Sequence, residues 1–112
     1  MRLSLVIPAY NEAEGVEQTA EAMRTLLVNL SKTYDVEVVF VKDGSKDETA
    51  KLLKAEFTGD DRVHVISHEV NKGLGAAIRT GLQHAKGDVV ITTDFDGTYP
   101  LATSQWEKRN IA

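Results

Sequence analysis

The chain has 112 residues, of which 42% are hydrophobic and 27% are charged, a composition that suits one compact domain with one modest core. Its formal net charge of −4 argues against broad electrostatic attraction to nucleic acid or to anionic lipid. The absence of cysteine excludes a disulfide framework, a thiolate metal site and a cysteine nucleophile, and it makes the cytoplasm the expected compartment.

Short apolar runs alternate with helical patterns along the chain, which is typical of βαβ units that build a parallel sheet. Residues 3–7 predict a first strand. Apolar residues at intervals of three or four then predict a helix over about residues 12–30, and its acidic N-terminal end suits the positive end of the helix dipole. Residues 36–41 predict a second strand.

A second helix and a third strand are expected in the middle of the chain. Ser45 and Glu48 have the spacing of a capping box, so the helix is expected to open there and to run through Phe57. A turn signal at residues 59–61 follows, and it leads into a third, shorter strand over residues 63–67.

The remaining pattern completes a sheet of about four strands. Residues 74–85 have the apolar spacing of a helix and residues 89–93 predict a buried strand, so the fold class is α/β, a three-layer, open, mainly parallel sheet with helices on both faces. Residues 1–100 are expected to form this domain, because no repeat or linker interrupts them. Residues 101–112 have poor apolar periodicity and are expected to form a tail that frays or folds on a partner. The sequence lacks the roughly 18 consecutive apolar residues that a membrane span requires.

Polar residues gather where three of the expected strands end. In an open parallel sheet, the carboxyl ends of the strands border the crevice in which ligands bind. An aromatic side chain there can pack on a base, and carboxylates can accept hydrogen bonds or hold a cation that bridges to phosphates. The pattern therefore predicts a nucleoside diphosphate site, built from Pro8, Tyr10 and Glu12 after the first strand, Asp43 after the second, and Asp94-Phe95-Asp96 after the fourth.

Simpler structural roles stay open at each of these positions. Taken alone, Asp94 and Asp96 are more typical of a solvated turn after a strand than of a metal site. Tyr10 can be a packing aromatic after a strand terminator, and Asp43 can belong to the turn before the second helix. Surface or capping roles are expected for the histidines, which lack the spacing of zinc ligands: His64, His68 and His84.

Four motifs follow one another over roughly the first hundred positions of the chain. They are VIPAYNE at residues 6–12, VKDGS at residues 41–45, NKGLGAA at residues 71–77 with Gly81, and Gly87-Asp88 leading to Asp94-Phe95-Asp96. In this order they resemble the motifs of family 2 glycosyltransferases, and most of all those of the dolichyl- or polyprenyl-phosphate sugar transferases. Such a series is far more specific than any one short motif.

The resemblance implies the nucleotide-binding, Rossmann-like half of a GT-A fold that binds a UDP- or GDP-linked sugar. It implies a lipid phosphate as the acceptor class and a place in the cytoplasm, at the cytoplasmic face of a membrane. A divalent cation, Mg²⁺ or Mn²⁺, would neutralise the charge on the nucleoside diphosphate leaving group. The implied nucleotide contacts are Pro8, Tyr10, Glu12, Val41, Asp43, Asp94 and Phe95, and the implied metal ligands are Asp94 and Asp96.

Three departures from the family pattern leave alternatives open. Lys42 stands where the family commonly has an acidic residue, and Thr98 stands where close relatives often have Gln. Family members also continue well past the metal motif, so we expect a nucleotide-binding half without an acceptor side or an assigned catalytic base, and its unpaired sheet edge favours a homo-oligomer. The alternatives are a non-catalytic nucleotide-binding or assembly module and, further from the pattern, a receiver-type signalling domain phosphorylated at Asp43.

Overall fold

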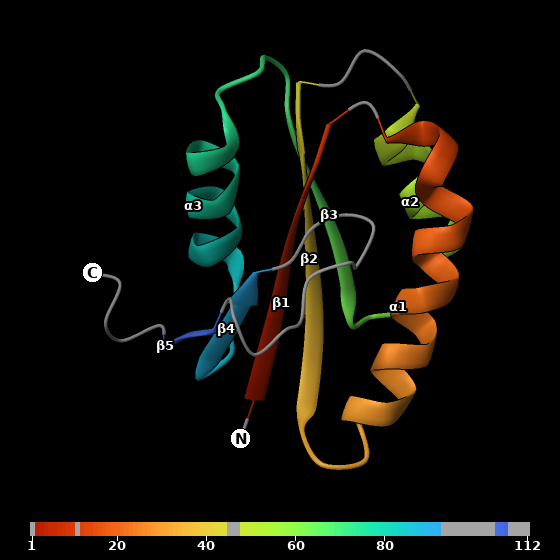
Figure 1. Ribbon diagram of the computed structural model, residues 1–112, viewed down its shortest axis with the longest axis vertical. Coiled ribbons are helices and arrows are strands. Elements are labelled where there is room, and N and C mark those ends of the chain that lie inside the picture. Colours follow the sequence, from red (N-terminus) through yellow and green to blue (C-terminus); the bar gives the residue numbers. More distant parts are fainter. Residues whose placement is uncertain (1, 11, 45–47, 93–104, 108–112) are drawn as a thin grey trace.

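The computed structural model describes residues 2–10, 12–44, 48–92 and 105–107, the last three by their backbone alone. Within these residues one sheet has the strand order β3-β2-β1-β4-β5 (Figure 1). Four of its strands are parallel and the fifth pairs antiparallel with β4, which confirms the predicted mainly parallel α/β sheet. The strands are β1 (Arg2–Ala9), β2 (Asp35–Asp43), β3 (Val63–His68), β4 (Val89–Thr92) and β5 (Gln105–Glu107).

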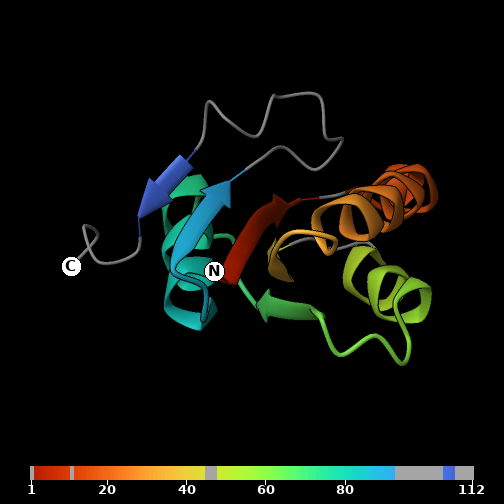
Figure 2. The same ribbon diagram turned by 90° about the horizontal axis from the view of Figure 1, so that it is seen from below.

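Helices cover both faces of this sheet, as the three layers in Figure 2 show. A short 3-10 turn, η1 (Ala13–Gly15), leads into α1 (Val16–Leu30), which lies on one face beside α2 (Thr49–Glu56). The opposite face is covered by α3 (Leu74–His84). No helix in the described part of the chain is long and apolar enough to cross a membrane.

Alternation along the strands divides the buried side chains between two cores. On β1, Leu5 and Ile7 belong to the core under α1 and α2, whereas Val6 belongs to the core under α3. The same alternation on β2 places Phe40 under α1 and α2, where its ring lies 5.8 Å from that of Phe57. Each such buried side chain stabilises the fold by about 1.5–3 kcal/mol, so the two cores together hold the sheet between its helices.

Two strands are longer than their apolar runs predict. β1 continues through Pro8 to Ala9, and β2 continues to Asp43. These extensions carry polar residues of both strands to the same edge of the sheet.

The predicted start of the second helix at Ser45 is wrong, and Ser45 itself lies outside the described residues. α2 begins at Thr49, and its N-terminal cap is Glu48, which makes no side-chain capping hydrogen bond. The helix starts later because Thr49 is fully buried and its hydroxyl accepts a hydrogen bond from the backbone N–H of Glu12 at 3.0 Å. A contact between distant parts of the chain therefore sets the start of α2.

The final stretch of the chain contributes a strand. β5 lies within residues 101–112, which were expected to form a tail, and it pairs with β4 so that Trp106 is opposite Val90. The other residues of that stretch lie outside the described residues.

Candidate functional site

The carboxyl ends of β1 and β2 lie side by side at the upper end of the view in Figure 1. Pro8 is paired with Val41 and Ala9 with Lys42, so the residues that follow β1 start next to the end of β2. The chain also passes from β3 into α3 at this end. We call this end of the sheet the carboxyl edge.

The structure brings most of the predicted site residues to the carboxyl edge, in different environments. Tyr10 is 48% exposed, and Pro8 and Glu12 are half-buried. Val41 differs, because its side chain is fully buried in the core under α3. Nothing in the described residues tests whether these groups contact a nucleotide, and their assignment stays a prediction.

Asp43 lies at the end of β2 and is 5% exposed, with both carboxylate oxygens bonded to the chain. Its Oδ1 accepts hydrogen bonds from the backbone N–H of Lys72 at 2.8 Å and from Nδ1 of His68 at 2.9 Å. Its Oδ2 accepts from the backbone N–H of Gly73 at 2.8 Å. A carboxylate has about four acceptor positions, so this network leaves Asp43 roughly one for a ligand.

The protonation state of Asp43 follows from these contacts. Burial by itself raises the pKa of a carboxyl group, but the Lys72 amide, the His68 ring and the Gly73 amide together hold the pKa of Asp43 below its ordinary value. Asp43 is therefore an anion at neutral pH. An anion can only accept, so Nδ1 of His68 must carry the proton of their hydrogen bond.

The second ring nitrogen of His68 is also hydrogen-bonded. Nε2 of His68 lies 2.8 Å from Oγ1 of Thr80 on α3, and the two atoms share a hydrogen bond. Sequence reasoning assigned His68 a surface or capping role and did not consider Thr80. One signal was available, because His68 directly follows the expected third strand, at the end where ligands bind; in the structure it pairs with Asp43 across the sheet.

Gly44, the residue after β2, makes a further contact with the loop that follows β3. Its φ of 72° is a conformation that favours glycine. A Cβ added there would lie 2.2 Å from the backbone nitrogen of Asn71, and the Gly44 amide donates to the carbonyl of His68 at 3.1 Å. The turn after β2 and the loop before α3 are therefore in direct backbone contact.

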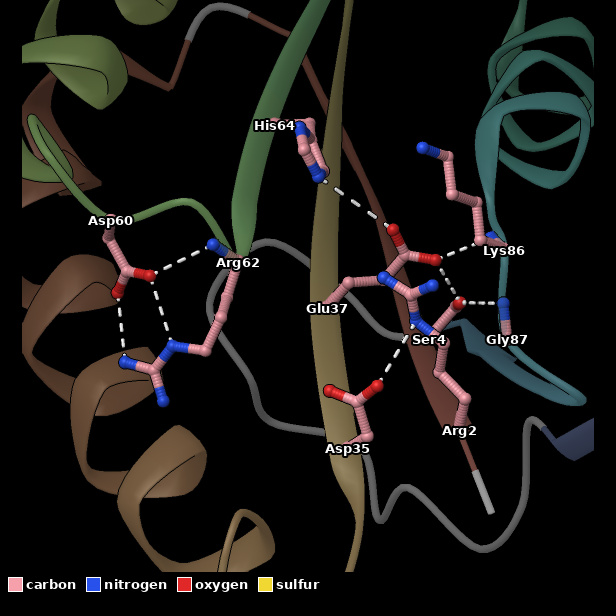
Figure 3. A network of polar contacts seen from close by, with 9 residues as sticks. All are labelled: Arg2, Ser4, Asp35, Glu37, Asp60, Arg62, His64, Lys86 and Gly87. Carbon is pink, nitrogen blue, oxygen red and sulfur yellow. Dashed lines mark hydrogen bonds and ion pairs between the residues drawn. The ribbon is translucent and has the colours of Figure 1, made fainter.

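A second buried carboxylate, Glu37, lies near the other end of β2 and is 2% exposed (Figure 3). Its Oε2 accepts hydrogen bonds from the Ser4 hydroxyl, at 2.6 Å, and from the backbone N–H of Lys86. Ser4 Oγ in turn accepts from the backbone N–H of Gly87 at 2.8 Å. No sequence motif marks this network, because it depends on the register of β1 and β2.

The metal ligands expected from the sequence, Asp94 and Asp96, lie outside the described residues, as does Phe95. Within the residues that are described, no three histidine or acidic side chains gather closely enough to hold a metal ion. The chemistry of the expected pair fits a hard cation, since Mg²⁺ and Mn²⁺ prefer carboxylate oxygens.

The family of the chain is decided by a match over most of its length. A family model for glycosyl transferase family 2 matches residues 4–103. The chain belongs to this family. The resemblance stated from the motifs is thereby confirmed, and the receiver-type alternative is set aside.

Relatives of this family 2 chain include enzymes named for lipid-linked sugars. The bactoprenol glucosyl transferase of Shigella phage SfV is 39% identical over 101 residues, which cover 90% of this chain and 32% of the relative. A dolichyl-phosphate beta-glucosyltransferase of Trichomonas vaginalis is 35% identical over 98 residues, which cover 85% of this chain and 30% of the relative. The family 2 chain thus spans about a third of the length of these curated relatives.

Solved structures confirm the fold of the family 2 chain. A mannosyltransferase from Pyrobaculum calidifontis, in complex with GDP-Man and Mn²⁺, matches with a TM-score of 0.69 and 30% identity over 88% of this chain and 28% of its own. TarS 1-349 from S. aureus, in complex with UDP-GlcNAc, matches with a TM-score of 0.63 and 27% identity over 86% of this chain and 27% of its own. The predicted α/β fold of the GT-A type is therefore confirmed.

Proposed function

We propose that this chain binds the nucleoside diphosphate part of a sugar donor at the carboxyl edge, as the donor-binding portion of a glycosyltransferase. The observation that carries the proposal is the convergence of family motifs on one edge, since Pro8 and Val41 are paired and Asp43 ends the same strand as Val41. A structural neighbour holds GDP-Man and another holds UDP-GlcNAc, which supports a nucleotide-sugar as the ligand.

The proposed contacts follow from the exposure of each group. Tyr10 offers an exposed ring on which a base can pack, and Glu12 lies in the loop that α2 holds through Thr49. Asp43 keeps roughly one acceptor position for a donor group of the base or ribose. The backbone around Pro8 and Val41 would shape the floor of the site, because the Val41 side chain is committed to the core.

A divalent cation completes the proposal. Asp94 and Asp96 would hold Mg²⁺ or Mn²⁺, and the cation would offset the charge that develops on the departing diphosphate. One structural neighbour is a complex with Mn²⁺, which supports this cofactor class. These two residues follow β4 in the sequence, and β4 is the parallel strand next to β1.

Calorimetric titration with UDP and GDP, each with and without Mn²⁺, tests the proposal. We expect one nucleotide to bind with a dissociation constant that falls when Mn²⁺ is added. Asp96→Ala should remove the part of the affinity that depends on Mn²⁺, because the cation loses an anionic ligand. Asp61→Ala, at an exposed carboxylate, is the matched control and should bind as the unaltered chain does.

Failure of both nucleotides to bind under every metal condition would refute the donor site. Equal loss in Asp96→Ala and Asp61→Ala would instead refute the metal assignment, because it would show that the effect is not specific to the pair after β4.

The proposed acceptor is a polyprenyl phosphate. One relative is named a bactoprenol glucosyl transferase and another a dolichyl-phosphate beta-glucosyltransferase, and these names support this acceptor class. Incubation with a nucleotide-sugar, Mn²⁺ and undecaprenyl phosphate, followed by extraction of the lipid, measures transfer directly. Nucleotide binding without transfer would favour the non-catalytic alternative for these 112 residues.

A further inference from the structure

We propose that His68 and Thr80 are positioning residues of the donor site. In this inference, which rests on the proposed function, they act through Asp43 to fix the loop between β3 and α3 against the end of β2. We call Asp43, His68, Thr80 and the amides of Lys72 and Gly73 the edge clamp.

The edge clamp joins four separate pieces of the chain. Asp43 belongs to β2, His68 to the end of β3, the two amides to the loop before α3, and Thr80 to the body of α3. The bonds that join them are between 2.8 and 2.9 Å. The backbone of Gly44 also lies against that of Asn71 and donates a hydrogen bond to the carbonyl of His68, so the end of β2 is in direct contact with the loop.

The bonds to Asp43 are the strong ones in this arrangement. Hydrogen bonds to an ionised group are roughly twice as strong as those between neutral groups. The His68 side chain is 9% exposed and that of Asp43 is 7% exposed, so water screens the pair little. The bonds to Asp43 therefore hold the loop between β3 and α3 in a defined position against the end of β2.

The position of this loop matters at the carboxyl edge. The loop leaves β3 at the end of the sheet where β1 and β2 also end, and Val70 within it is 68% exposed. Asp43 and Gly44 are themselves part of the VKDGS motif of the family, which begins at Val41 in β2, so the clamp holds the backbone that carries this motif. A ligand bound there would lose affinity if the loop and the motif could move apart, since binding would then have to order them.

Thr80 is the member that can be changed with least disturbance. Thr80→Val keeps the size and the β-branch of the side chain and removes the hydroxyl that bonds Nε2 of His68. Thr80→Ser keeps the hydroxyl and serves as the conservative variant. Thr25→Val, at an exposed helix position where the hydroxyl bonds only its own helix, controls for the general effect of this substitution.

The experiment measures nucleotide affinity by calorimetry with Mn²⁺ present, and hydrogen exchange of the Lys72 and Gly73 amides by NMR. We expect Thr80→Val to weaken binding about 3- to 10-fold, the value of one net hydrogen bond, and to speed exchange at both amides. Thr80→Ser and Thr25→Val should bind within about twofold of the unaltered chain. His68→Asn, whose amide can replace Nδ1 but cannot reach Thr80, should behave like Thr80→Val and serves if that variant does not fold.

Two outcomes separate this inference from the proposed function. If the unaltered chain binds no nucleotide, the proposed function fails and the donor role of the clamp fails with it, whatever the amides show. If the unaltered chain binds and Thr80→Val binds equally well, only the inference is overturned, even if the variant melts at a lower temperature. Loss of affinity in Thr80→Ser equal to that in Thr80→Val would also overturn it, because the hydroxyl would then be irrelevant.

Discussion

Two buried carboxylates on β2 bind the backbone amides that flank α3. Asp43 accepts from the amides before the helix, and Glu37 accepts from the amide of Lys86 after it. Both side chains lie on the face of β2 that α3 covers, as alternation along a strand requires. An acidic residue inside a strand of the core is costly unless it is bonded, so each of the two carboxylates depends on these amides.

Glu37→Gln should destabilise the chain at neutral pH. The amide oxygen can still accept from Ser4 and Lys86, but the bonds become neutral and therefore weaker. We expect the free energy of unfolding at pH 7 to fall by about 1–2 kcal/mol in urea denaturation. Glu56→Gln is the control, because Glu56 is a half-buried partner of Arg24. It should lower the free energy of unfolding by no more than about 1 kcal/mol. Equal losses in the two variants would show that burial of Glu37 does not matter.

At the scale of elements, α3 fits between the two acids because its length matches the strand. The 11 residues of α3 rise about 15 Å at helical spacing, and the non-helical residues on either side of the helix extend this span toward the roughly 20 Å that residues 37–43 of β2 cover at strand spacing. The helix can therefore be bonded at both ends while its middle packs on the sheet. Gly81 permits that packing, since a Cβ there would lie 2.3 Å from Cγ1 of Val6 on β1.

Two glycines of α3 should respond in opposite directions to alanine. Gly81→Ala should lower the free energy of unfolding by about 1–3 kcal/mol, because the buried Val6 side chain has no room to move. Gly75→Ala, where a Cβ would meet nothing within 4 Å, should raise it by about 0.5–1 kcal/mol through helix propensity. Thermal unfolding of both variants gives the comparison, and destabilisation by Gly75→Ala would contradict this account of the helix.

At the scale of the whole molecule, acid should destabilise the fold. Burial alone would raise the pKa values of Glu37 and Asp43, but their hydrogen bonds lower them overall, and the Arg62 side chain lowers the pKa of Asp60. A carboxyl group whose folded pKa lies below its unfolded value stabilises the fold above the unfolded pKa, near 4, and this contribution is lost as the pH falls through the folded pKa.

The free energy of unfolding should therefore fall from about pH 5 downward. Urea denaturation at pH 7, 5, 4 and 3 measures the slope. Glu37→Gln should flatten it, because one carboxyl no longer takes up a proton on unfolding, while Asp61→Asn at an exposed position should leave it unchanged. A chain that is as stable at pH 3 as at pH 7 would contradict the lowered pKa values.

The sequence predicted the strands and helices in their correct order, because each depends on apolar spacing within one short segment. Residues 63–67 and 89–93 were placed almost where β3 and β4 lie. The start of α2 was missed because it depends on Thr49 meeting the loop after β1, and β5 was missed because a three-residue strand needs β4 beside it. Capping rules and periodicity describe a segment and its neighbours in sequence, and neither contact is of that kind.

The candidate site was also only partly predictable from the sequence. The motifs around Tyr10, Asp43 and Asp94 determined the family and the edge of the sheet to consider, because a series of motifs in order is read directly from the chain. Only the tertiary structure decided that Asp43 is held by His68 and by two amides, since these groups are 25 to 30 positions away in sequence. The sequence alone identifies the types of side chain available for binding. The number of acceptor positions that Asp43 keeps for a ligand depends on the donors that the fold brings to it, and these are known only from the tertiary structure.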